Sequence, residues 1–136
     1  MSATQERAQS AMKKLTPVIM VQSIEPCLPF WDRLGFTKTA EVPDGDRLGF
    51  VILAKDSVEV MYQTHESVEK DAAGLVPRAH GHGAALFIEV SDVQSVARAL
   101  EGIEIVVPRR KTFYGMDEIG VREPGGHVVM FAQPTG

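Results

Sequence analysis

The sequence predicts an α+β protein in which two βαβββ modules form a curved, cup-like mixed sheet with helices on its outer face. The same order of strand and helix patterns occurs twice along the 136 residues. Short segments of the two halves also correspond at a nearly constant offset. Finally, the stretch from Val121 to Gln133 reads as a strand, a tight turn and a strand of β-branched and aromatic residues. We expect that last strand to be buried on both faces, because its apolar residues are almost continuous.

The first half contains one helical pattern among four strand patterns. Ser23 can cap the helix, and apolar residues then recur at helical spacing up to a stop at Gly35. Pro29 is unfavourable inside a helix, so the helix either bends there or begins late. The expected elements are a strand at Leu15–Gln22, a helix at Ile24–Leu34, and strands at Phe36–Val42, Leu48–Lys55 and Ser57–Gln63.

The second half repeats this order after a polar connector. Ser91, with Gln94 three residues later, resembles a capping box at the start of the second helix. The expected elements are a strand at Ala84–Val90, a helix at Val93–Leu100, strands at Ile103–Val107, Glu118–Arg122 and His127–Gln133, and an irregular stretch at Lys111–Met116. We therefore divide the chain into an N-terminal tail (1–14) and a single domain (15–136). The domain comprises module one (about 15–63), the connector (about 64–83, with a possible helical turn at 66–72) and module two (about 84–133).

The repeat is structural rather than textual. Val90 of the second half matches Val21 of the first, and Val129 matches Val58 at a similar spacing, each at the same point in its module. Two such modules placed side by side would bring their inner sheet faces together around a concave space, where a small ligand could bind.

Composition excludes several classes of protein. The net charge of −4 argues against a nucleic-acid partner, and the apolar runs are far too short to span a membrane. The single cysteine, Cys27, cannot form an internal disulfide and fits a reducing cytoplasm. Because Cys27 lies on an apolar helix face, a buried small side chain is favoured over a nucleophile.

The ordered set of motifs resembles the vicinal oxygen chelate superfamily of glyoxalases, bleomycin-resistance proteins and extradiol dioxygenases. The residues that carry the resemblance are Pro17–Val21, Pro29–Phe36, Tyr114–Met116 and Val121–His127. The resemblance covers Leu15 to Gln133 and implies a cup that holds a small molecule. It also implies a homodimer, although the sequence leaves open whether each cup closes within one chain or by exchange between chains.

The resemblance also implies where a metal would bind. Metal enzymes of the superfamily carry His, Gln or Glu at matched positions of the inner strands, which correspond here to Thr16, Glu59, Ala85 and Met130. Only Glu59 offers a usual oxygen ligand, whereas a catalytic zinc needs three protein ligands. We therefore expect no metal and no cofactor, closest to the metal-free bleomycin-resistance branch.

The histidines offer few alternatives. His80 and His82 lie two residues apart in the connector and could chelate a metal, but a solvated loop is the favoured interpretation. His127 follows the turn, and we place it on the rim of the cup, either as a general base or as a polar rim residue. The sequence assigns no catalytic residue. The basic run at 109–111 is interpreted as a solvated edge rather than an anion site.

Alternation along the strands predicts the ligand-binding lining of the cup. It consists of Val18, Met20, Phe50, Glu59, Met61, Phe87, Tyr114 and Met130. Methionine and aromatic side chains make an adaptable wall, although some of them could simply fill the core. Glu59 could meet a cationic ligand, act as a base or face solvent.

These patterns favour a metal-independent small-molecule-binding protein that holds a hydrophobic or cationic ligand, as antibiotic-resistance proteins of this type do. A metal-dependent lyase, isomerase or dioxygenase, using Glu59 with connector histidines or His127, is the first alternative. A non-catalytic interaction domain with a filled cup is the second.

Overall fold

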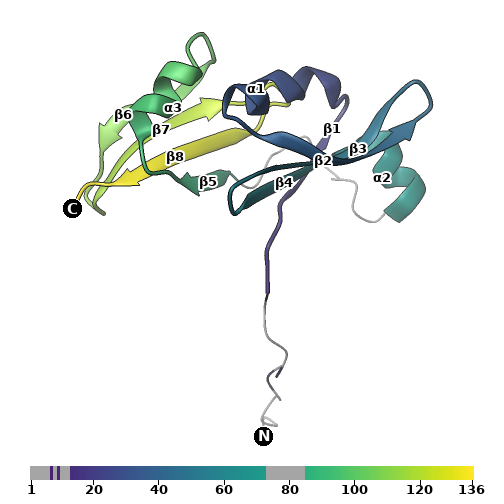
Figure 1. The fold of residues 1–136 in the computed structure, drawn as a ribbon, viewed down its shortest axis with the longest axis horizontal. Coiled ribbons are helices and arrows are strands. Elements are labelled where there is room, and N and C mark those ends of the chain that lie inside the picture. The colour runs from purple at the N-terminus through teal and green to yellow at the C-terminus, as the bar shows by residue number, and fades with distance from the viewer. Residues whose placement is uncertain (1–6, 8, 10–12, 73–84) are drawn as a thin grey trace, which may run out of the picture.

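The computed structural model describes residues 7, 9, 13–72 and 85–136, and these form an α+β fold of two βαβββ modules (Figure 1). Module one contains β1 (Val18–Val21), the 3₁₀ turn η1 (Glu25–Cys27), α1 (Leu28–Arg33), β2 (Thr37–Asp44), β3 (Arg47–Lys55) and β4 (Val58–Thr64). The helix α2 (His65–Ala72) follows it. Module two contains β5 (Leu86–Glu89), α3 (Val93–Ala99), β6 (Ile105–Lys111), β7 (Met116–Arg122) and β8 (Val128–Pro134). The predicted fold class is confirmed.

Each module forms its own four-stranded mixed sheet, with strand orders β1-β4-β3-β2 and β5-β8-β7-β6. The first and last strands of a module pair in parallel, and the other neighbours are antiparallel. The sheets lie side by side and remain open, so the single continuous cup that the sequence suggested is not closed within this chain (Figure 1).

One face of both sheets packs into a shared hydrophobic core. Residues alternate between this face and the opposite one along β4 and β8, as the burial of Val60 and Tyr62 and of Val129 and Phe131 shows. Helix α1 lies between the two sheets (Figure 1), and its Trp31 is completely buried in the core. The same cluster contains residues of both modules, which explains how two separate sheets become one folded unit.

The first helix differs from its prediction at its start. Residues 25–27 form a 3₁₀ turn, and the α-helix begins only at Leu28, so that Pro29 lies in its first turn. There the missing N–H removes no intrahelical hydrogen bond. The late start foreseen for this segment is therefore what the chain adopts, in place of a continuous helix over Ile24–Leu34.

One further expectation is corrected. Strand β8 is buried on its core face, whereas Val128 and Met130 on the opposite face are only half-buried, so it is not enclosed on both sides. The helical turn expected at residues 66–72 is confirmed, because α2 spans His65–Ala72. No helix within residues 13–72 and 85–136 is long and apolar enough to cross a membrane.

Candidate functional site

The face of module one opposite the core carries the predicted cup lining. The strand register places Val18 beside Met61, and Met61 beside Ile52. A second row, formed by Met20, Gln63 and Phe50, lies next to it. These side chains are half-buried, except for Val18, which is 43% exposed. The module therefore presents a mainly apolar surface of aliphatic, thioether and aromatic groups. Ile52 and Gln63 also belong to this surface and were not predicted from the sequence.

Glu59 lies at the end of this surface and is already paired. Its Oε1 accepts a hydrogen bond from the Thr16 hydroxyl at 3.3 Å and forms an ion pair with Lys14 Nζ at 2.8 Å. The hydrogen bond from Lys14 lowers the pKa of the Glu59 carboxyl. Because the Lys14 side chain is 58% exposed, a cationic ligand could displace it and leave the carboxylate as its counter-ion.

The corresponding face of module two carries Phe87, Met130 and Gly120 in one row. Phe87 is 54% exposed, and the Met130 side chain covers Gly120. An ideal Cβ on Gly120 would lie 2.5 Å from the Met130 sulfur, so the glycine lets this flexible side chain lie flat on the sheet.

A polar group that the sequence analysis did not identify lies on the same face. Glu118 is completely buried, and its carboxylate accepts hydrogen bonds from the Arg110 guanidinium at 2.9 Å and from the Tyr114 hydroxyl at 2.7 Å. The hydrogen bond to Glu118 raises the pKa of Arg110. Tyr114, a predicted lining residue, is therefore held by its hydroxyl over the inner face. In the basic run, Arg109 forms an ion pair with Asp117 and Arg110 forms one with Glu118. These pairs join neighbouring strands of the sheet and so have a structural role.

The ladders correct the correspondence between the modules. Val18 pairs with Met61 in module one, and Phe87, the counterpart of Val18 at the start of module two, pairs with Met130. The equivalent of Met61 is therefore Met130, and the equivalent of Glu59 is Val128. The match of Met130 to Glu59 that was predicted from the sequence is therefore wrong, because it places the last strands of the two modules out of register.

The corrected positions do not suit a metal ion. They hold Thr16, Glu59, Ala85 and Val128, a set with one carboxylate, one weak hydroxyl donor and two hydrocarbon side chains. No group of three or more His, Cys, Asp and Glu side chains suited to a metal occurs in the described parts of the chain. His80 and His82 lie outside the described residues.

His127 occupies a different place from the expected rim. It lies at the β7–β8 hairpin, where its Nδ1 is 2.7 Å from Oε1 of Glu123, and its position shares the core side of the strand with Val129. Glu123 is 1% exposed and also accepts hydrogen bonds from the backbone amides of Gly125 and His127. The β7–β8 hairpin thus encloses the buried Glu123 carboxylate, and His127 faces this carboxylate rather than a ligand.

The Glu123 carboxylate is also hydrogen-bonded to module one. The Tyr62 hydroxyl donates to Glu123 at 2.7 Å, and Trp31 Nε1 donates to the Tyr62 hydroxyl at 2.8 Å. Burial raises the pKa of Tyr62, so the phenol keeps its proton. Burial opposes ionisation of Glu123, yet the hydrogen bonds it accepts hold its pKa below the ordinary value.

Burial also raises the pKa of the Cys27 thiol to about 12, which is expected of a packed side chain rather than a nucleophile.

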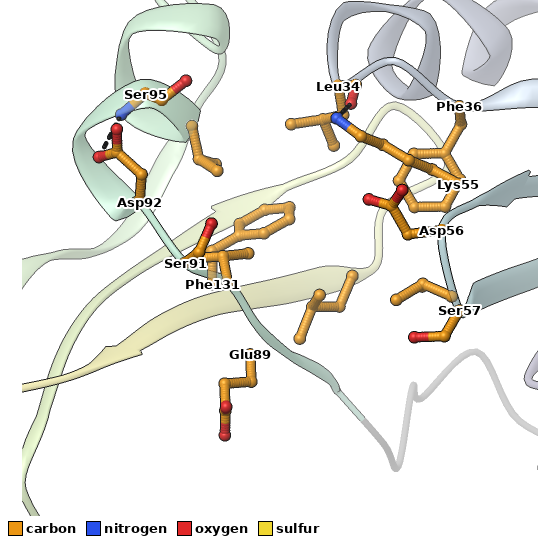
Figure 2. Close-up of a pocket in the computed structure, with 14 residues that line it drawn as sticks. Leu34, Phe36, Lys55, Asp56, Ser57, Glu89, Ser91, Asp92, Ser95 and Phe131 are labelled. Carbon is orange, nitrogen blue, oxygen red and sulfur yellow. Dashed lines mark hydrogen bonds between the residues drawn. The ribbon is translucent and has the colours of Figure 1, made fainter.

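The eight predicted lining residues therefore fall into two groups within one chain. Five lie on the inner face of module one and three on that of module two, and none lines the cleft shown in Figure 2. All eight side chains are half-buried or exposed. Among the described residues, the predicted lining therefore lies on two separate sheet faces rather than around one pocket.

The protein is thus built from two βαβββ modules, and each module has an inner face, which is the face of its sheet opposite the hydrophobic core. Residues 14–131 match the family model of the Glyoxalase/Bleomycin resistance protein/Dioxygenase superfamily, and the chain belongs to that superfamily. No curated protein shows significant similarity to its sequence.

Solved structures share the fold at low sequence identity. TioX from Micromonospora sp. ML1 is 20% identical, with a TM-score of 0.70 over 90% of this chain and 99% of its own. A lactoylglutathione lyase from Agrobacterium tumefaciens is 15% identical, with a TM-score of 0.67 over 94% of this chain and 96% of its own. A glyoxalase/bleomycin resistance protein/dioxygenase from Nocardioides is 14% identical, with a TM-score of 0.69 over 93% and 86%. These likenesses establish the fold alone.

Proposed function

We propose that the chain is a metal-independent small-molecule-binding protein that holds a hydrophobic or cationic ligand against its inner sheet faces. The composition of the module-one face supports this proposal, because its methionine, aromatic and aliphatic side chains lie next to Glu59, whose ion-pair partner Lys14 is exposed and could be displaced. Such a surface suits sequestration of an apolar or cationic compound, including an antibiotic, in the cytoplasm.

We further propose that a homodimer completes the site. The inner faces expose three large apolar side chains, Val18 (43%), Val42 (55%) and Phe87 (54%). Exposed apolar surface of this kind often marks a site of contact with another protein. Covering module one of one copy with module two of another would enclose both groups of lining residues. Light scattering after gel filtration should give twice the mass of the 14.9 kDa chain, and a monomer would contradict this part of the proposal.

Ligand binding can be tested by equilibrium dialysis against aromatic amines, each paired with a neutral alcohol of the same shape. Glu59→Gln should weaken binding of the amine by about fivefold, because an exposed ion pair contributes at most about 1 kcal/mol. The neutral compound should be unaffected. Glu41→Gln is the matched control, since Glu41 also pairs with a lysine at 2.8 Å but its position pairs with the buried Val51, on the opposite face of the same sheet.

Metal analysis distinguishes this proposal from an enzyme. Protein purified without added metal should contain well under one equivalent of zinc, nickel or iron, and chelation should leave ligand binding unchanged. A stoichiometric metal that is lost in Glu59→Gln would contradict the proposal and favour a metal-dependent lyase, isomerase or dioxygenase. The donor set at the four matched positions predicts the first result.

A further inference from the structure

A cleft lies between the two modules, away from the inner faces (Figure 2). Its volume is about 360 Å³, which lies within the range of small-molecule sites. One wall comes from Leu34, Phe36 and the β3–β4 turn, and the other from the end of β5 and the start of α3. Phe131, which is buried, forms part of the floor, so the base of the cleft belongs to the shared core.

The charges at the rim of this cleft are predominantly acidic. Asp56, Glu89 and Asp92 line it together with a single cation, Lys55. The Lys55 amino group is held along the rim by the Leu34 carbonyl oxygen at 2.7 Å, as Figure 2 shows. Asp92 uses one carboxylate oxygen to cap α3 through the Ser95 amide. Within the described residues, Asp56 and Glu89 have no side-chain partner.

We propose that this inter-module cleft binds a small organic cation, with its aromatic or aliphatic body against Phe36 and Phe131 and its ammonium group against Asp56. An apolar floor beneath a rim that carries the unpartnered Asp56 carboxylate is complementary to such a molecule, whereas the Glu89 side chain points away from the cleft and Asp92 is turned toward the start of α3 (Figure 2). Because the walls belong to different modules, an occupant bridges them and stabilises their packing. This site is independent of the proposed cup, since the two share no lining residue.

The test uses 2-naphthylmethylamine and its neutral counterpart 2-naphthalenemethanol, titrated into the 136-residue chain and followed by NMR. The amine should shift the amide signals of residues 55–58 and 88–92 in a saturable manner and bind more tightly than the alcohol. Equal affinity for the two compounds would overturn the proposal. Shifts confined to Val18, Met61 and Met130 would also overturn it, because they would place the amine on the inner faces.

Asp56→Asn provides the decisive variant. Asp56 has a φ of 53°, a left-handed conformation that asparagine tolerates, so the turn should be preserved. The variant should bind the amine about threefold to fivefold more weakly and the alcohol unchanged. Asp46→Asn, in the exposed β2–β3 turn of the same module, should bind both compounds as the unmodified protein does. Equal loss in the two variants, or no loss in Asp56→Asn, would contradict the assignment of Asp56.

Discussion

Replacing Glu123 with alanine is expected to lower the free energy of unfolding by about 3–5 kcal/mol, as removal of one partner of a buried charged network does. The Glu123 carboxylate accepts hydrogen bonds from the Tyr62 hydroxyl, the Gly125 amide and the His127 amide, and its Oε1 is 2.7 Å from the His127 ring. Alanine would leave these groups buried without an acceptor. Urea unfolding followed by far-UV circular dichroism measures the loss, which approaches the whole stability of a small domain.

Two controls separate the network from a general effect of charge. Glu69→Ala removes an exposed carboxylate of α2 and should change stability by no more than about 0.5 kcal/mol. Tyr62→Phe keeps Glu123 but removes the bridging hydroxyl, which should cost about 1–3 kcal/mol because Trp31 Nε1 loses its acceptor. If Glu123→Ala were as stable as Glu69→Ala, the carboxylate would not hold the β7–β8 hairpin against module one.

The same carboxylate gives the stability a defined pH dependence. Its pKa in the folded chain lies below the ordinary value of 4.5, so ionised Glu123 stabilises the fold fully above about that pH. This contribution is lost as the pH falls through the lowered pKa. The unmodified protein should therefore lose stability below pH 4.5 more steeply than Glu123→Gln, whose side chain does not titrate. Parallel acid-unfolding curves would contradict this assignment.

The fold could be predicted because its signals are local and repeated. Strand alternation, helical spacing of apolar residues and the glycines that end the helices together indicate two βαβββ modules. The predicted caps were wrong, because no side chain caps α1 and Asp92 rather than Ser91 caps α3. The residue-by-residue correspondence between the modules could not be predicted. Val129 and Val60 are equivalent only because of how their strands pair with β5 and β1, and the sequence of one strand does not determine its pairing register. The placement of the sheets side by side also depends on long-range packing around Trp31.

The inner faces were predicted more accurately than the polar groups upon them. Alternation places Met61 and Met130 correctly, since it requires only a strand and a known core side. The same rule applied to Ile119 and Val121 would have placed Glu118 on the inner face, where Arg110 and Tyr114 bind it. The role of Glu123 was not predicted, because the hairpin turns its carboxylate toward Tyr62 of the other module, a contact 61 residues away in sequence.

Trp31→Ala should cost about 3–5 kcal/mol, the range for large aromatic truncations in a packed core. Trp31 is fully buried and contacts Phe30, Phe36 and Tyr62 edge to face, with ring centroids 5.1, 4.9 and 6.4 Å away. Its removal opens a cavity beside the α1 segment that lies between the two sheets. Circular dichroism must follow the unfolding, because this is the only tryptophan in the chain.

Phe113→Ala is the matched control for this truncation, since Phe113 is fully exposed at the β6–β7 turn and should contribute no more than about 0.5 kcal/mol. Trp31→Phe should fall between the two, because it keeps an aromatic ring but loses the hydrogen bond to Tyr62 at 2.8 Å. This order would show that the modules are joined by one aromatic core and one hydrogen-bonded chain from Trp31 to Glu123. Equal stability of Trp31→Ala and Phe113→Ala would instead mean that each module folds without the packing around α1.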